Sequence, residues 1–136
     1  MLIEWTDALS VNIAEIDGQH QKLVALLNGL HEATLHAGHD VPLGKLFDEL
    51  LEYAAVHFNA EEKLMERYGF PELPPHRAEH EKFVRQVVGF KGLQEFEFYS
   101  KFLSKDLLTF LQHWLQTHIM KTDKLYAPFL NERGIR

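Results

Sequence analysis

Histidine and carboxylate side chains lie within the apolar stripes of several helical segments of this chain. Between residues 43 and 68, for example, Tyr53, Ala54, His57 and Glu61 fall on one face of an expected helix. Such a face packs against neighbouring helices, so its imidazoles and carboxylates would be buried. An unpartnered buried polar group costs about a few kcal/mol, and an unpaired carboxylate costs more. A fold of this chain therefore needs a strong polar interaction inside its core.

Seven residues make up this polar set: His20, His57, Glu61, His76, His80, His118 and Asp123. The pairs His57/Glu61 and His76/His80 are four residues apart, so each pair lies on one helix face about one turn apart. Asp123 follows His118 by five residues and would point about 140° away from it on an ideal helix. The two can converge only if the helix ends or bends between them, and we expect a break there.

Metal coordination would compensate for this burial. The chain has no cysteine, which excludes disulfides, zinc ribbons, iron–sulfur clusters and cysteine nucleophiles. Five imidazoles and two carboxylates, without a thiolate, suit a borderline metal such as iron. Two six-coordinate irons offer about twelve positions. The histidines fill five of them, two bridging carboxylates four and a bridging oxide or hydroxide two, which leaves one position open for a small ligand.

The apolar periodicity predicts an all-α fold. Asp17 is placed to cap a first helix that ends near Gly38, and Pro75 is placed to open a third that frays around Gly89 and Gly92. The second, fourth and fifth helices are expected at about residues 43–68, 95–121 and 123–132. The short links predict an up-down-up-down four-helix bundle, with a short C-terminal fifth helix and an N-terminal arm that holds Trp5.

Composition narrows the class of protein. The 136 residues suffice for one domain, 1–136. A net charge of −6 without a basic run argues against nucleic acid or anionic lipid as a partner. The N-terminal residues lack the cationic start and apolar core of a secretory signal, and no apolar run approaches the roughly 20 residues of a membrane span. We expect a cytoplasmic protein without membrane insertion.

The motifs in this chain resemble those of the hemerythrin family, and most closely those of the single-domain bacteriohemerythrins. The matching segments cover nearly the whole chain and are Ile16–His20, His57–Glu62, Gly69–Pro71, His76–His80, His113–Ile119 and Asp123. The resemblance implies that His76, His80 and His118 hold one iron and that His20 and His57 hold the other. It also implies that Glu61 and Asp123 bridge the two, and that the two-histidine iron has the vacancy.

The function implied by the resemblance is reversible dioxygen binding at this diiron centre, as an oxygen carrier or store rather than an enzyme. The expected partners are dioxygen and an oxygen-consuming enzyme, and the expected state is a monomer. An apolar pocket would restrict water and proton access to the centre. Its expected wall is Leu23, Phe58, Trp114, Leu115 and Ile119, with Ile3, Trp5 and Tyr126 as further candidates.

Two other functions remain open from the sequence: an oxygen or redox sensor, and an enzyme that acts on peroxide or nitric oxide at the same site. The remaining histidines are expected outside the centre. His36 and His39 are predicted at the surface, His113 is predicted to face outward, and His31 lies about 16 Å along the helix from His20. A further set of glutamates is interpreted as solvated charges: Glu62, Glu66, Glu79 and Glu81.

Overall fold

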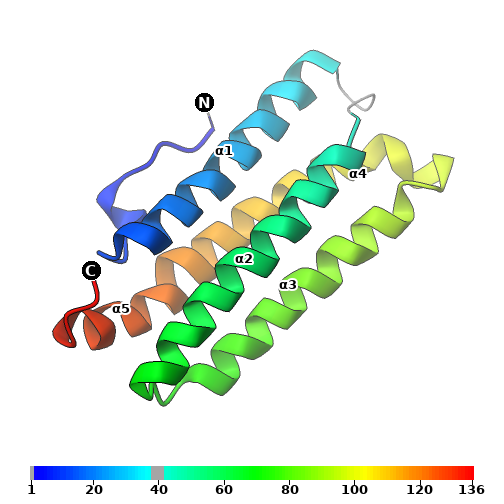
Figure 1. Ribbon diagram of the computed structural model, residues 1–136. Helices are drawn as coiled ribbons and strands as arrows, with labels where there is room; N and C mark the ends of the chain where they lie inside the picture. Colours follow the sequence, from blue (N-terminus) through cyan, green and yellow to red (C-terminus); the bar gives the residue numbers. More distant parts are fainter. Residues whose placement is uncertain (1, 38–41) are drawn as a thin grey trace.

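The computed structural model describes residues 2–37 and 42–136, which form helices and no strands (Figure 1). In chain order the elements are η1 (Asp7–Leu9), α1 (Ala14–Ala37), α2 (Gly44–Tyr68), α3 (Leu73–Leu93), α4 (Glu97–Trp114), η3 (Leu115–Thr122) and α5 (Asp123–Glu132). The element η1 is a single 3₁₀ turn, whereas η3 is a π-helix. The predicted all-α fold is confirmed.

The four long helices form a bundle in which α1 and α3 each contact both α2 and α4 (Figure 1). Short connections join them in alternating directions, as predicted. The N-terminal arm runs alongside α1, where Ile3 pairs with Asn28, to the end of the bundle that holds α5 and the chain's C-terminus. At that end the Lys124 ammonium donates to the carbonyl oxygens of Ser10 and Asp7, which ties the arm to α5.

Two apolar clusters fill the bundle, and the polar residues lie between them. The larger cluster includes Leu23 and Phe58, and the smaller one, near α5, includes Ile16 and Met65. His20 lies between Ile16 and Leu23 in α1, as Glu61 lies between Phe58 and Met65 in α2. Each fully buried leucine or isoleucine contributes about 1.5–3 kcal/mol, so the clusters hold the helices in register around a polar layer.

The start of α1 differs from the prediction. The helix begins at Ala14, so Asp17 lies in its first turn and is not the N-cap residue. The Asp17 carboxylate instead accepts hydrogen bonds from the Ser10 hydroxyl at 2.5 Å and the Val11 N–H at 2.8 Å. Asn12, between Val11 and the start of α1, has a φ of +55°, a conformation that asparagine tolerates better than most residues. Asp17 therefore holds the arm against α1.

The second helix ends where predicted, because Gly69 adopts a left-handed φ of +70° and the Phe70 N–H donates to the Met65 carbonyl at 2.8 Å. The third helix begins two residues before Pro75, which fits the first turn because no N–H is required there. The predicted fraying at Gly89 and Gly92 is wrong, since α3 continues to Leu93. The predicted stop at Gly38 and the surface position of His39 lie outside the described residues.

No break separates the fourth and fifth helices. The expected α-helix ends at Trp114, and η3 then leads directly into α5. Hydrogen bonds from i to i+5 define this segment, and such π-turns within helices frequently mark functional sites. The expected break between His118 and Asp123 was therefore wrong, and a wider helical turn takes its place. Across the described part of the chain, no helix is both long and apolar enough to cross a bilayer.

Candidate metal centre

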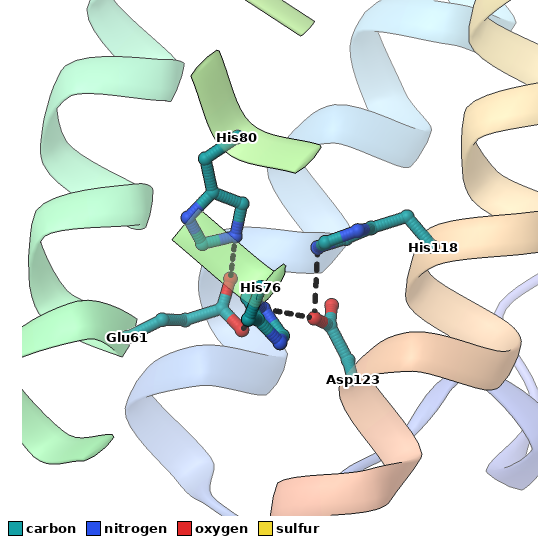
Figure 2. A group of neighbouring side chains, drawn as sticks. All are labelled: Glu61, His76, His80, His118 and Asp123. Carbon is teal, nitrogen blue, oxygen red and sulfur yellow. Dashed lines mark ion pairs between the residues drawn. The ribbon is translucent and has the colours of Figure 1, made fainter. Parts of the chain in front are cut away.

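All seven predicted residues converge in the polar layer of the bundle, and each is at most 2% exposed. Their donor atoms form two groups, each with all members within 4.8 Å of one another. The three-histidine group contains Glu61, His76, His80, His118 and Asp123, which Figure 2 shows pointing toward one another from four segments. The two-histidine group contains His20, His57, Glu61 and Asp123. Glu61 and Asp123 belong to both groups.

Asp123 faces both groups with different oxygens. Its Oδ1 atom lies 3.0 Å from Nε2 of His76 and 3.0 Å from Nε2 of His118, and its Oδ2 atom lies 3.1 Å from Nε2 of His20. This is the arrangement that a carboxylate shared between two ions requires.

Glu61 also reaches histidines of both groups. Its Oε1 atom lies 2.6 Å from Nε2 of His57 and 3.7 Å from Nε2 of His80, and its Oε2 atom lies 3.7 Å from Nε2 of His76. Two carboxylates thus join five imidazoles into one continuous cluster.

The inward-facing atoms have the properties of metal ligands. The Nε2 atoms of all five histidines and the four carboxylate oxygens are buried, and although they approach one another closely, they make no hydrogen bond of good geometry with the described residues. Neighbouring ligands of an octahedral ion with bonds of about 2.1 Å lie about 3.0 Å apart, as the Asp123 contacts do. A donor set of nitrogen and oxygen without sulfur suits iron. The residues fit a non-haem iron site.

The π-helix places Asp123 in the cluster. The Asp123 N–H donates to the carbonyl oxygen of His118, five residues earlier. In such a turn, residues five apart are brought nearly into line, whereas an α-helix would separate them by about 140°.

Electrostatic coupling within the cluster shifts several pKa values. Burial opposes the charge of His76, but contacts with Asp123 and Glu61 outweigh it and raise the His76 pKa to about 9. Burial, aided by the neighbouring histidines, lowers the pKa of His80 to about 4. Burial would raise the pKa of Asp123, yet His118, His20 and His76 hold it well below its usual range. The cluster thus favours an ionised Asp123, the form that binds a metal.

The Nδ1 atoms of three ligand histidines meet oxygen acceptors. Gln19 Oε1 lies 2.6 Å from Nδ1 of His57, Glu62 Oε2 lies 2.8 Å from Nδ1 of His80, and Glu79 Oε1 lies 3.2 Å from Nδ1 of His118. An Nδ1–H donor leaves Nε2 free to bind a metal, so these contacts fix the required tautomer.

The interpretation of Glu62 and Glu79 as solvated charges was therefore wrong. Glu62 contacts a histidine 18 positions away and Glu79 contacts one 39 positions away, so only the packing of the helices reveals these pairs. Gln19, next to His20, was also not predicted. Glu66 and Glu81 are exposed, as predicted.

Aromatic rings cover three of the histidines. Phe58 stacks on His80 with a centroid separation of 3.9 Å, and Trp114 stacks on His118 at 4.0 Å. Both rings therefore lie over the three-histidine group. On the other side, Tyr53 stacks on His57 at 5.0 Å, a contact that the sequence analysis did not predict.

The expected pocket residues are all buried, namely Leu23, Phe58, Trp114, Leu115 and Ile119. All five belong to the larger apolar cluster, against which Ile3 and Trp5 of the arm also pack. Tyr126 belongs to the smaller cluster, with its ring centroid 5.5 Å from that of His76. The centre is enclosed by apolar side chains on both sides.

The other predicted histidine positions agree with the structure where it describes them. His113 is exposed, as predicted from its angle to His118. His36 is also exposed and lies 3.8 Å from Glu32, one helical turn earlier. His31 belongs to neither donor group.

A helical bundle that encloses a buried histidine–carboxylate cluster defines a class of metal-binding proteins. Similarity to known proteins identifies the family within this class. Residues 11–130 match the hemerythrin HHE cation binding domain. The chain is 34% identical over 131 residues to bacteriohemerythrin of Methylococcus capsulatus, covering 96% of this chain and 98% of that protein. It is 35% identical over 126 residues to bacteriohemerythrin of Stenotrophomonas maltophilia, covering 93% and 80%.

A solved structure of wild-type hemerythrin superimposes with a TM-score of 0.74 at 30% identity, covering 94% of this chain and 97% of that one. This chain belongs to the hemerythrin family, as its motifs indicated.

Proposed function

We propose that this chain binds two irons per molecule and reversibly binds dioxygen there, as a carrier or local store. The observation that carries the proposal is the pair of donor groups that share Glu61 and Asp123. One group offers three imidazoles and the other two, so the two-histidine position has room for an external ligand once a bridging oxide or hydroxide is counted. When bound, a pair of ferrous ions can supply the two electrons that dioxygen binding of this kind uses.

The protein's contribution is to hold the ions and keep the site dry. His76, His80 and His118 would hold one ion, His20 and His57 the other, and the two carboxylates would bridge them. Because the ligands are at most 2% exposed, water and protons have restricted access to the centre. Restricted proton access favours the return of dioxygen over its reduction.

The composition of the ligand set supports binding rather than turnover. Ferritin-like diiron proteins use four glutamates and two histidines, an anionic set that favours higher oxidation states. This centre has two carboxylates and five histidines. We therefore propose a binding protein rather than an enzyme, one that works as a cytoplasmic monomer and supplies dioxygen to an oxygen-consuming enzyme.

The test is to expose the reduced, iron-loaded protein to dioxygen and then purge it with inert gas. The proposal predicts a colour change that appears with dioxygen, disappears on purging and repeats over several cycles. Steady consumption of peroxide or nitric oxide by the same preparation would instead favour an enzyme that acts on these substrates. Irreversible oxidation in the first cycle, with the iron retained, would contradict a carrier.

A further inference from the structure

Two carboxylates outside the ligand set contact ligand histidines, and both lie on the same side of the centre. We propose that Glu62 and Glu79 are charged positioning residues that make the three-histidine side the tighter metal position. This inference rests on the proposed two-ion centre and assigns an order in which its two positions fill. Ions would occupy the three-histidine side first and leave it last.

Glu62 joins α2 to α3 through two different oxygens. Its Oε2 atom accepts from Nδ1 of His80 at 2.8 Å, and its Oε1 atom accepts from Nε of Arg77 at 2.9 Å. The Glu62 side chain is only 22% exposed, so Arg77 and His80 hold it in one orientation. Phe58 stacks on the face of the same imidazole, with the ring centroids 3.9 Å apart. The ring of His80 is thus fixed both along its Nδ1 direction and in its plane.

Glu79 performs the equivalent connection between α3 and the π-helix. Its Oε1 atom lies 3.2 Å from Nδ1 of His118 and 3.2 Å from the Thr122 hydroxyl. The same hydroxyl lies 3.2 Å from the carbonyl oxygen of Thr117. Glu79 therefore contacts the π-helix at its middle, His118, and at its last residue, Thr122, within the turn that aligns His118 with Asp123.

The two-histidine side has a different environment. His57 donates through Nδ1 to the neutral amide oxygen of Gln19 at 2.6 Å. Nδ1 of His20 is buried and has no hydrogen-bond partner among the residues described. Two formal negative charges thus contact the histidines of one group, whereas among the described residues the Nδ1 contact of the other group is an uncharged amide.

This difference in charge has a direct consequence for metal affinity. A carboxylate that accepts from Nδ1–H makes Nε2 a more basic donor and partly offsets the positive charge of the ion. Loss of such a partner typically weakens metal binding by about 10–100-fold. The third imidazole would also favour the same side, so the contribution of the carboxylates must be measured by substitution.

The experiment titrates the metal-free protein with Co²⁺ alone and follows the visible absorption of the bound ion. Wild type is expected to bind two ions in two steps of different affinity. Glu62→Gln and Glu79→Gln keep an oxygen acceptor but remove the charge, and each should weaken the first step by about 10–100-fold. The second step should change by less than threefold. Gln19→Glu should act on the second step instead and strengthen it.

Two controls isolate the charge from other effects. Glu81→Gln removes the same charge from an exposed residue next to His80 and should leave both steps unchanged. Glu62→Ala and Glu79→Ala remove the acceptor as well and should weaken the first step further. Circular dichroism of each metal-free variant checks that the bundle remains folded, which is expected because both side chains are partly exposed.

The outcomes separate this inference from the proposed function. Unchanged first-step affinity in both glutamine variants, or equal weakening of the two steps, overturns the assignment of Glu62 and Glu79. A wild-type protein that binds only one Co²⁺ contradicts the two-ion centre, and the same variants still show whether the carboxylates strengthen the remaining position. Two Co²⁺ ions with the expected variant effects, but no reversible reaction of the iron form with dioxygen, would leave this inference intact and reject the proposed function.

Discussion

The backbone N–H of Asp123 donates to the carbonyl oxygen of His118, and the two side chains meet with Oδ1 and Nε2 3.0 Å apart. The first contact spans five residues, one more than in an α-helix. This backbone hydrogen bond explains the side-chain contact. An α-helix would hold the two residues about 140° apart, whereas the wider turn brings them onto one face. One additional residue in the turn thus completes the metal centre.

Deletion of Gln116, an exposed residue in the π-helix, should restore α-helical spacing and remove Asp123 from the centre. His118 and Asp123 would still be five residues apart, and once the shortened segment winds as an α-helix, at about 100° per residue, their side chains would lie about 140° apart. We expect the deleted protein to remain helical by circular dichroism but to lose most of its bound iron by metal analysis. The substitution Gln116→Ala keeps the residue count and should retain the iron. Full iron content after the deletion would show that the π-helix is not needed.

The sequence predicts the convergence of the seven polar residues because five of them lie within the apolar stripes of their helices, and His20 adds a histidine from the first helix. His57 and Glu61, for instance, share a face by spacing alone, and the apolar residues around them indicate that this face is buried. Asp123 is the exception. Periodicity identifies the angular mismatch with His118 but cannot distinguish a break in the helix from a π-turn, since both correct the angle.

Contacts between helices are harder to predict from one sequence. Glu62 and Glu79 have the charged residue type and the helical position typical of solvated residues. Their roles depend on how α2, α3 and the π-helix pack. The start of α1 has a similar cause: Asp17 has the residue type of a cap, but hydrogen bonds from Ser10 and Val11 use its carboxylate instead. Local propensity cannot decide between two such partners.

Substitution of either shared carboxylate should remove a ligand from both ions. Glu61→Ala and Asp123→Ala are therefore expected to lose most of the bound iron, as measured on the purified proteins. His113→Ala, which changes an exposed histidine five residues before His118, should keep wild-type iron content. Comparable losses of iron in Glu61→Ala and His113→Ala would mean that metal binding does not depend on whether these side chains point into the bundle or out of it.

The buried residues Leu115 and Ile119 should control how long the protein keeps its capacity for dioxygen. Replacement by Ala opens a cavity near the centre, which can admit water where polar partners are available. We expect faster irreversible oxidation in air with unchanged iron content. The measurement is the capacity for dioxygen that remains after repeated cycles of dioxygen and purging. The truncation should cost about 2–5 kcal/mol of stability. Leu125→Ala, at an exposed leucine, is the control, and equal lifetimes in all three variants would assign no protective role to the pocket.

Tyr53 and Tyr126 should resist ionisation in the folded, metal-free protein. Burial and the charges of Glu61 and Asp123 raise the pKa of both phenols well above 10. The unfolded chain loses these protons near pH 10 and the folded one does not, so the free energy of unfolding should fall as pH rises beyond that value.

The measurement is the ultraviolet absorbance of phenolate at about pH 10.5, with and without denaturant. Tyr126→Phe should leave the native amplitude unchanged and lower the unfolded amplitude by one of the chain's four tyrosines. A lower native amplitude in this variant would place an ionised Tyr126 in the folded protein and reject the expected shift.

The number of irons per chain tests the central claim most directly. The metal-free protein is freed of dioxygen, titrated with Fe²⁺ under anaerobic conditions and separated from free metal, and iron and protein are then quantified in the same sample. Two donor groups that share Glu61 and Asp123 predict about two irons per chain in wild type, and a large loss in Asp123→Ala. One iron per chain at saturation, in folded protein that gives the same value in repeated titrations, would contradict a carboxylate-bridged pair.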